Sequence, residues 1–309
     1  MRWTVGICAV AAIAGIAATL TIPAQTITPD EATLKLFPPD IQGIASFDAA
    51  ALRNSSLIQE LLQKQSYPRA AQDFFDATGV QPFRDVDKVT VALGSKLLAI
   101  VEARYDRFKV EQYLQNQGAA SETYLGRVLY SPNAQQFGSI SFIDHMVLAG
   151  DTAMLKQVID RLAAPAPNVL ENAALMEMIR KSESGNQVWV VGLNADALAN
   201  SSVPAPVPPQ FQDILKSLAS GSYQMRITQD VHVKAIGNFA NSDSARTSAD
   251  LLRGLIALAR TQAAPQPDVV HLLDGVRVDN AGSLMTIQID MPGDLLKTLQ
   301  PKRLAELAR

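Results

Sequence analysis

The feature that most constrains the fold of this chain is a short stretch that occurs twice. Residues 48–56 read DAAALRNSS, and residues 194–202 read NADALANSS. Much of the agreement consists of Ala and Ser, which are common in this chain, so the echo by itself is weak evidence. The flanking sequence decides whether the two stretches mark the same structural corner.

Both stretches open the same order of predicted elements, judged from hydrophobic periodicity and turn residues. In the first part of the chain we predict a strand at 41–48, a helix at 57–65, a hairpin of strands 85–94 and 96–105, a helix at 107–117, a second hairpin of strands 122–131 and 138–150, and a helix from 152. In the second part we predict a strand at 187–194, a helix at 211–219, a hairpin of strands 222–229 and 231–240, a helix from 241 or 242 to 264, a hairpin of strands 269–280 and 282–291, and a last helix opened by Gly293-Asp294.

This order predicts a duplicated unit, and Gly150-Asp151 and Gly293-Asp294 recur at corresponding places in it. Hairpins create antiparallel neighbours, so a wholly parallel sheet is excluded. We therefore expect an α+β fold of two tandem related units, each a largely antiparallel sheet with helices on one face. The two sheets either join into one or pack as separate lobes.

Proline-rich segments suggest where the units begin and end. AAPAPN at 163–168 stops a helix and marks the boundary between them, because Pro cannot continue the helical hydrogen-bond ladder. We expect a leader at 1–24, a spacer at 25–37, a first α+β unit at 38–165 and a second at 166–309.

Acidic or amide residues recur where a predicted strand gives way to a helix. They are Asp48, Asp106, Asp151, Asn194, Asn241 and Asp294. The first turn of a helix leaves backbone N–H groups unpaired, and a short side-chain oxygen satisfies one of them. We interpret these six residues as helix caps in preference to catalytic carboxylates.

The uncharged segment at residues 3–22 predicts export. Pro23 and Ala24 favour a cleaved signal peptide, whereas an apolar run long enough to span a bilayer favours an uncleaved membrane anchor. We expect cleavage. In either case residues 25–309 lie outside the cytoplasm, in the periplasm or tethered to the inner membrane.

Composition excludes several function classes. The chain carries a formal charge of −3, and no segment concentrates Lys or Arg, which argues against a nucleic-acid partner. Cys8 is the only cysteine and lies within the leader, so the exported part has neither a disulfide nor a thiolate metal site.

No residue pattern predicts catalysis. We place His145, His232 and His271 within strands, and we expect each to be exposed to solvent or held by a hydrogen bond rather than to act as a ligand or base. The nucleophile elbow, the phosphate-binding loop and the zinc-protease motif are absent from the sequence. We therefore assign no catalytic, cofactor-binding or metal-binding residue and no cofactor.

One segment suggests recognition of a partner. VPAPVPP at 203–209 favours a stiff polyproline conformation. It is either a rigid connector or a docking loop, and the candidate partner-binding residues are Val203, Pro204, Pro206, Val207, Pro208 and Pro209.

The layout resembles exported bacterial proteins that consist of domains of unknown function. The residues that carry the resemblance are SFDAAALRNSSLIQELL, LLAIVEARYDRFKVEQYL, ETYLGRVLYS and FIDHMVLAGDTAMLKQVIDRL, within residues 41–162. The resemblance implies no activity and no catalytic residue. We expect an envelope protein that binds or scaffolds, with another envelope protein as its candidate partner; the alternative is an envelope hydrolase with a cleft between the two units.

Overall fold

The computed structural model of the chain describes residues 31–63, 69–94, 96–132, 138–182, 185–194 and 214–298. The predicted leader and the proline-rich segment at 203–209 lie outside these residues. In the part that the structure describes, no helix combines the length and the apolar character needed to cross a membrane.

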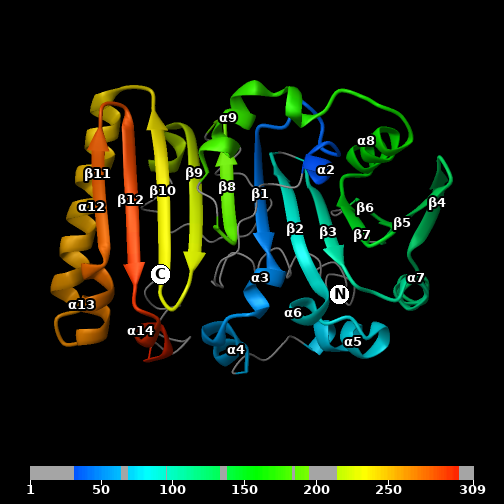
Figure 1. Cartoon of the computed structure of the whole chain (residues 1–309), viewed down its shortest axis with the longest axis horizontal. Coiled ribbons are helices and arrows are strands. Elements are labelled where there is room, and N and C mark those ends of the chain that lie inside the picture. The colour runs from blue at the N-terminus through cyan, green and yellow to red at the C-terminus, as the bar shows by residue number, and fades with distance from the viewer. Residues whose placement is uncertain are drawn as a thin grey trace.

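The core of the molecule is one open, twelve-stranded sheet in which every pair of neighbours is antiparallel (Figure 1). The α+β fold and the antiparallel sheet are thus confirmed, and the sheet is continuous. Its strands are β1 (Gly43–Asp48), β2 (Val86–Leu93), β3 (Leu98–Ala103), β4 (Ala120–Tyr124), β5 (Arg127–Ser131), β6 (Ser139–Ile143), β7 (Met146–Gly150), β8 (Val188–Gly192), β9 (Leu218–Ile227), β10 (Val231–Phe239), β11 (Val276–Ala281) and β12 (Leu284–Met291).

The pair formed by β1 and β8 lies at the centre of the sheet. On one side of it the order is β2, β3, β7, β6, β5 and β4, and on the other side it is β9, β10, β12 and β11. We call these sides the first half, which includes β1, and the second half, which includes β8. Apart from the β4–β5 hairpin at the end of the first half, the chain visits both halves in the same strand order.

Helices connect the strands and cover the sheet. They are α2 (Glu31–Leu34), α3 (Ala49–Arg53), α4 (Ser56–Gln63), α5 (Arg69–Thr78), α6 (Pro82–Asp85), α7 (Arg107–Asn116), α8 (Thr152–Ala163), the 3-10 helix η1 (Val169–Glu171), α9 (Ala173–Lys181), α12 (Ser242–Gln262), α13 (Pro267–Asp274) and α14 (Gly293–Thr298).

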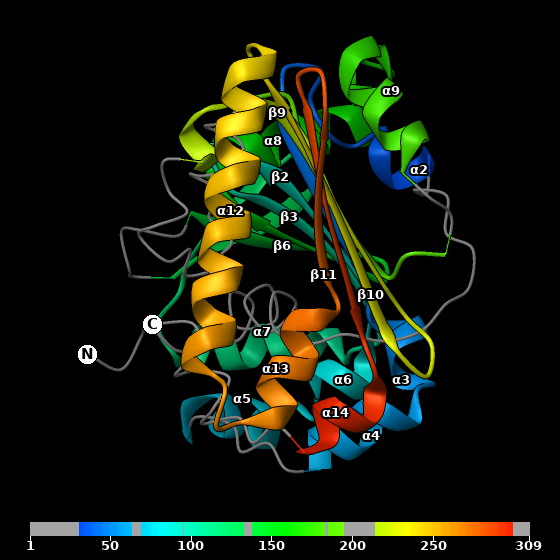
Figure 2. The ribbon, with the colours of Figure 1, turned by 90° about the vertical axis from the view of Figure 1, so that its left-hand side faces the viewer.

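Successive residues of β3 define the two faces of the sheet, because side chains alternate along a strand. On the Ile100 face, residues of α2, α8 and α9 form one core cluster with β1, β3, β7 and β8. On the Val101 face, α3 and α4 pack at the centre, α7 packs over β6 and α12 packs over β10–β12. Figure 2 shows α12 on one side of the sheet and α2 and α9 on the other.

The first half is therefore covered by helices on both faces, whereas we expected helices on one face of each unit. In the second half, α12 packs on the Val101 face, and no described helix forms a core cluster with the Ile100 face of β9–β12. Within the described residues, helices cover both faces of the first half and a single face of the second half.

Several predicted elements were displaced or misjudged. Residues 122–131 and 138–150 form two hairpins, β4–β5 and β6–β7, where we predicted one. Residues 269–274, predicted as the start of a strand at 269–280, lie in α13 (Pro267–Asp274). Pro267 suits the first turn of a helix, and Val269, Leu272 and Leu273 follow the helical period that places them together in one cluster.

The packing of residues 31–37 also differs from the prediction. Leu34 and Phe37, which we placed in a spacer, are 2% and 0% exposed within the core of the Ile100 face. This part of the predicted spacer therefore belongs to the folded body. Helices α5 and α9 were not predicted.

The helix caps are confirmed where the structure describes the whole corner. Asp48, Asp106 and Asp151 accept hydrogen bonds from the first turns of α3, α7 and α8 at 2.8, 3.3 and 3.2 Å. Asn241 caps α12 in the same way at 2.8 Å. Asp294 lies inside the first turn of α14, where the Gly293 N–H donates to Asp230 instead.

Candidate binding face

A single row of paired residues crosses the whole sheet on the Ile100 face. Directly opposite residues of antiparallel strands point to the same face, so the register defines the row. From β11 to β4 it runs Arg277, Gln288, Lys234, Gln224, Trp189, Ser46, Thr90, Ile100, Leu148, Ser141, Leu129 and Glu122. In the second half the row consists of charged and amide side chains followed by Trp189, whereas in the first half it consists of serine, threonine and aliphatic side chains and ends at Glu122.

A second row lies two residues further along the strands and is polar throughout. Arg226 of β9 is opposite His232 of β10, which is opposite Asp290 of β12. The Nδ1 atom of His232 lies 2.8 Å from the Oδ1 atom of Asp290. The imidazole and the carboxylate are thus held together in the middle of the open face.

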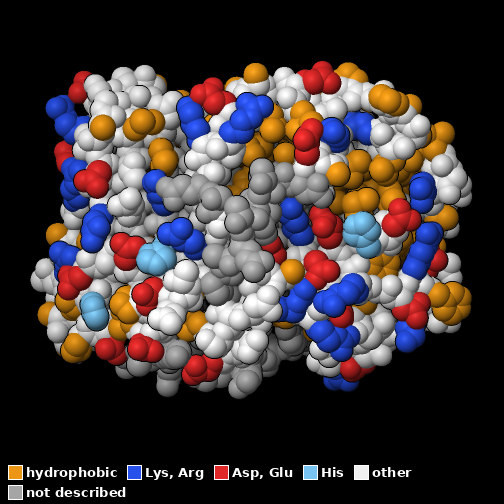
Figure 3. All heavy atoms as spheres, viewed as in Figure 1, with side chains coloured by type: hydrophobic (Ala, Val, Ile, Leu, Met, Phe, Trp, Pro, Cys, Tyr) orange, Lys and Arg blue, Asp and Glu red, His pale blue; other side chains and the backbone are white. Residues whose placement is uncertain are grey.

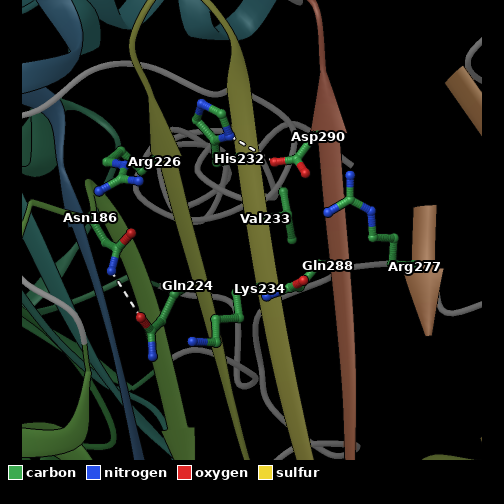
Figure 4. Close-up of a pocket in the computed structure, with 9 residues that line it drawn as sticks. All are labelled: Asn186, Gln224, Arg226, His232, Val233, Lys234, Arg277, Gln288 and Asp290. Atoms are coloured by element: carbon green, nitrogen blue, oxygen red, sulfur yellow. Dashed lines mark hydrogen bonds and ion pairs between the residues drawn. The ribbon is translucent and has the colours of Figure 1, made fainter. Parts of the chain in front are cut away.

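The two rows enclose an open pocket of about 260 Å³. Its lining residues are Asn186, Gln224, Arg226, His232, Val233, Lys234, Arg277, Gln288 and Asp290. Figure 4 shows that they come from adjacent strands and from the segment before β8. In Figure 3, charged side chains of both signs gather over these strands at the left of the view.

The pocket carries an excess of positive charge. Among the described lining residues, three cations, Arg226, Lys234 and Arg277, outnumber the one carboxylate, Asp290, in a chain whose formal charge is −3. Neither Arg226 nor Arg277 forms an ion pair or a side-chain hydrogen bond with another described residue. A guanidinium presents several N–H donors in a fixed plane, which suits it to bind an anion.

Buried amides form the side of the pocket nearest to the centre of the sheet. Asn186 Nδ2 donates to Gln224 Oε1 at 2.9 Å, and the two residues are 7% and 4% exposed. Next to them, Gln187 Oε1 accepts from the backbone N–H of Ile227 at 2.9 Å. These contacts fix the amide orientations and tie β9 to the chain that enters β8.

The structure separates the three histidines that the sequence singled out. His232 lies in β10 and has the expected hydrogen bond. His145 lies in the turn between β6 and β7, and His271 lies in α13, so their predicted placement in strands was wrong. Neither His145 nor His271 lines this pocket, and Val203–Pro209 lie outside the described residues.

Sequence reasoning missed the pocket although a signal was present. Residues 231–235 of β10 alternate between apolar and polar or small side chains, and Gln224, Arg226, Gln288 and Asp290 alternate with apolar residues on β9 and β12. Such alternation is typical of a strand that has one face on the core and one in water. The residues that meet across strands depend on the register, which the alternation leaves open.

Comparison of the chain with family models, with curated proteins and with solved structures found no match. Within the described residues, no group of three or more His, Cys, Asp or Glu side chains could hold a metal ion. The arrangement of side chains on the open face is therefore the basis for assigning a function.

Proposed function

We propose that this chain is an exported binding protein of the cell envelope and that its ligand binds to the open polar face of β9–β12. The observation that carries the proposal is the uneven cover of the sheet: no described helix forms a core cluster with this face of the second half, its charged side chains are partly or fully exposed, and two of the arginines have no described partner. The uncharged segment at residues 3–22 supports export.

A binding role is favoured over hydrolysis by the chemistry of the lining residues. The pocket pairs an imidazole with a carboxylate, but none of its nine described lining residues is a serine, threonine or cysteine. Covalent hydrolysis by a side-chain hydroxyl or thiol needs such a nucleophile within hydrogen-bond reach of its base. The same set of cations and amides suits reversible binding of a polar ligand.

We further propose that residues 38–165 and 166–309 are two copies of one unit, with Asp48 corresponding to Asn194 and Gly150-Asp151 to Gly293-Asp294. The shared strand order on both sides of the β1–β8 pair supports this proposal. Gly150 is the last residue of β7 and Gly293 lies two residues after β12, and these two strands take the same place in that order.

The backbone around the two glycines supports the correspondence as well. A Cβ atom on Gly150 would lie 2.1 Å from the carbonyl oxygen of Leu97, and one on Gly293 would lie 2.1 Å from that of Gln229. Leu97 immediately precedes β3, and Gln229 lies shortly before β10, its proposed counterpart. An experimental structure in which the paired residues fall on unrelated corners after superposition of the strands would contradict the duplication.

Hydrogen exchange tests the binding function. The purified full-length chain is measured with and without a soluble extract of its host's envelope, and we expect slower exchange in β9, β10 and β12. The Lys234→Glu variant should lose this protection, while Arg246→Glu, on the exposed side of α12 over the other face, should keep it. Protection that is absent, or that survives Lys234→Glu, would contradict the proposed site.

Fractionation of the native host tests export separately. We expect the chain in the periplasmic or membrane fraction, and N-terminal sequencing distinguishes a mature end near Gln25 from a retained leader. Recovery of residues 25–309 in the cytoplasm would contradict the envelope assignment and leave the binding site to be judged by hydrogen exchange.

A further inference from the structure

We infer that the ligand of the open face is an acidic saccharide, meaning a sugar or short glycan that carries carboxylate or phosphate groups. This inference rests on the proposed binding function and adds the chemical class of the ligand. It follows from the charge, the hydrogen-bonding groups and the apolar content of the pocket.

Charge specifies an anion. Arg226 and Arg277 lie on β9 and β11, so they flank Lys234 of β10 on both sides. The one lining carboxylate, Asp290, already contacts His232 at 2.8 Å. Asp279 follows Arg277 on the same side of β11, but no ion pair joins these two residues in the described chain. An anion would therefore find unpaired guanidinium donors at both ends of the pocket.

The spacing of the cations favours a ligand with more than one anionic group. Three strand-to-strand steps separate β9 from β11, which corresponds to about 14 Å across the sheet. A single small anion would contact one guanidinium at a time. A ligand that extends across the strands can place acidic groups near both.

The remaining lining groups specify a polar ligand. Gln288 offers amide donors and an acceptor, which match the hydroxyl groups of a sugar, and the buried amides of Asn186 and Gln224, which already contact each other, form the polar inner side of the pocket. Val233 is the one apolar residue among the described residues of the lining, and none of these residues is Phe, Tyr or Trp. A lipid tail or the apolar side chains of a peptide would gain little from such a surface.

Calorimetric titration of the full-length chain with defined probes tests the inference. Trigalacturonate and fructose 1,6-bisphosphate represent carboxylate and phosphate forms with more than one anionic group, and maltotriose is the uncharged control. We expect one or both acidic probes to bind and maltotriose to bind at least about tenfold more weakly. Added salt should lower the affinity for the acidic probe.

Variants locate the binding. Arg226→Ala and Arg277→Ala should each lower the affinity for the acidic probe by about tenfold, as expected for the loss of one charge-assisted hydrogen bond. Asp290→Asn keeps the shape and removes the negative charge, so it should strengthen binding. Arg246→Ala removes a cation that is paired with Asp243 on α12 and should leave binding unchanged.

The inference is overturned if maltotriose binds as tightly as the acidic saccharides, if neither arginine variant weakens binding, or if Asp290→Asn weakens it. Tighter binding of a hexaglutamate peptide would also overturn it, because the ligand would then be an acidic peptide. If no acidic saccharide binds while envelope extract still protects β9–β12, the ligand class is wrong and the proposed binding function remains.

Discussion

The two halves of the sheet share one hydrogen-bonded frame but differ in how the Ile100 face is used. In the first half, Ile100 and Leu148 are fully buried under α8 and α9. In the same row of the second half, Lys234 is partly exposed and Arg277 is exposed. The comparison shows that covering helices, rather than the pairing of strands, determine which part of the sheet is core and which is surface.

Polar groups on the two halves also differ in their partners. Glu102, on the covered half, accepts a hydrogen bond from the Thr33 hydroxyl of α2 at 3.0 Å. Arg226 and Arg277, on the open half, have no such described partner. A covering element of the first half thus satisfies a polar side chain of the sheet internally, whereas two guanidinium groups of the second half have no described partner.

Exchanging residues between the halves should have the largest effect. Ile100→Lys places an unpaired cation in a fully buried position and should cost more than about 4 kcal/mol of unfolding free energy, whereas Lys234→Ile should change it by less than about 1 kcal/mol. Urea unfolding measures both. Ile100→Val, expected to cost about 0.5–1.5 kcal/mol, is a control that should fold. Similar losses for Ile100→Lys and Lys234→Ile would refute the difference in burial.

Removing a covering side chain should have the next largest effect. Leu155 of α8 is 0% exposed, so Leu155→Ala should cost about 2–5 kcal/mol through lost burial and a cavity. Ile236, on the same face of the open half, is partly exposed, and Ile236→Ala should cost about 1 kcal/mol or less. Thermal unfolding at one pH measures both changes. If Ile236→Ala is the more destabilising variant, the inferred difference in burial between the two halves is wrong.

The caps of α7 and α12 should contribute smaller and similar amounts in the two halves. Asp106→Ala and Asn241→Ala each remove an oxygen that accepts a backbone N–H, at a cost of about 1 kcal/mol. Asp151→Ala should behave alike at α8. Chemical denaturation measures these losses, and Asp106→Asn is a control that keeps the acceptor. A loss that persists in Asp106→Asn would indicate a role for the charge beyond capping.

The last comparison concerns two tyrosines in alkaline solution. Burial raises the pKa of Tyr223 in the second half and of Tyr105 in the first half to about 12. The unfolded chain releases these protons near pH 10, so their contribution to stability is complete below about pH 10 and is lost as the pH rises towards 12.

Unfolding free energies at about pH 9 and about pH 11 measure this loss. Tyr223→Phe should reduce the difference between the two pH values, because Phe has no proton to release. A pH dependence that is identical in Tyr223→Phe and in the unmodified chain would show that Tyr223 titrates normally. If Tyr105→Phe reduces the difference between the two pH values while Tyr223→Phe does not, the raised tyrosine pKa is confined to the first half.

Local patterns in the sequence predicted the elements whose signals are contained in one segment. Alternation at Val89, Val91 and Leu93 predicted β2, and Asp106 and Asp151 predicted the starts of α7 and α8. The order of strands and helices was sufficient for the α+β class and the antiparallel sheet. These features follow from backbone geometry and capping within a few residues, which propensity and periodicity describe.

The errors came where a segment fits two periodicities. VVHLLDGVRVDN has apolar residues that suit a strand, yet residues 267–274 are helical because Val269, Leu272 and Leu273 pack together with Ala263 and Leu295. Residues 31–37 looked like a spacer because their burial depends on α8 and α9, which lie more than a hundred residues away.

The sequence by itself determined which side chains of each strand share a face. Residues 98–101 of β3 form a continuous apolar run, which predicts burial on both faces, and the alternation in residues 231–235 of β10 predicts burial on one. The tertiary structure decided that Arg226, Lys234 and Arg277 line one pocket on a face that no described helix covers. Their proximity depends on strand order and on where α8, α9 and α12 pack, and these are properties of contacts between segments far apart in the chain.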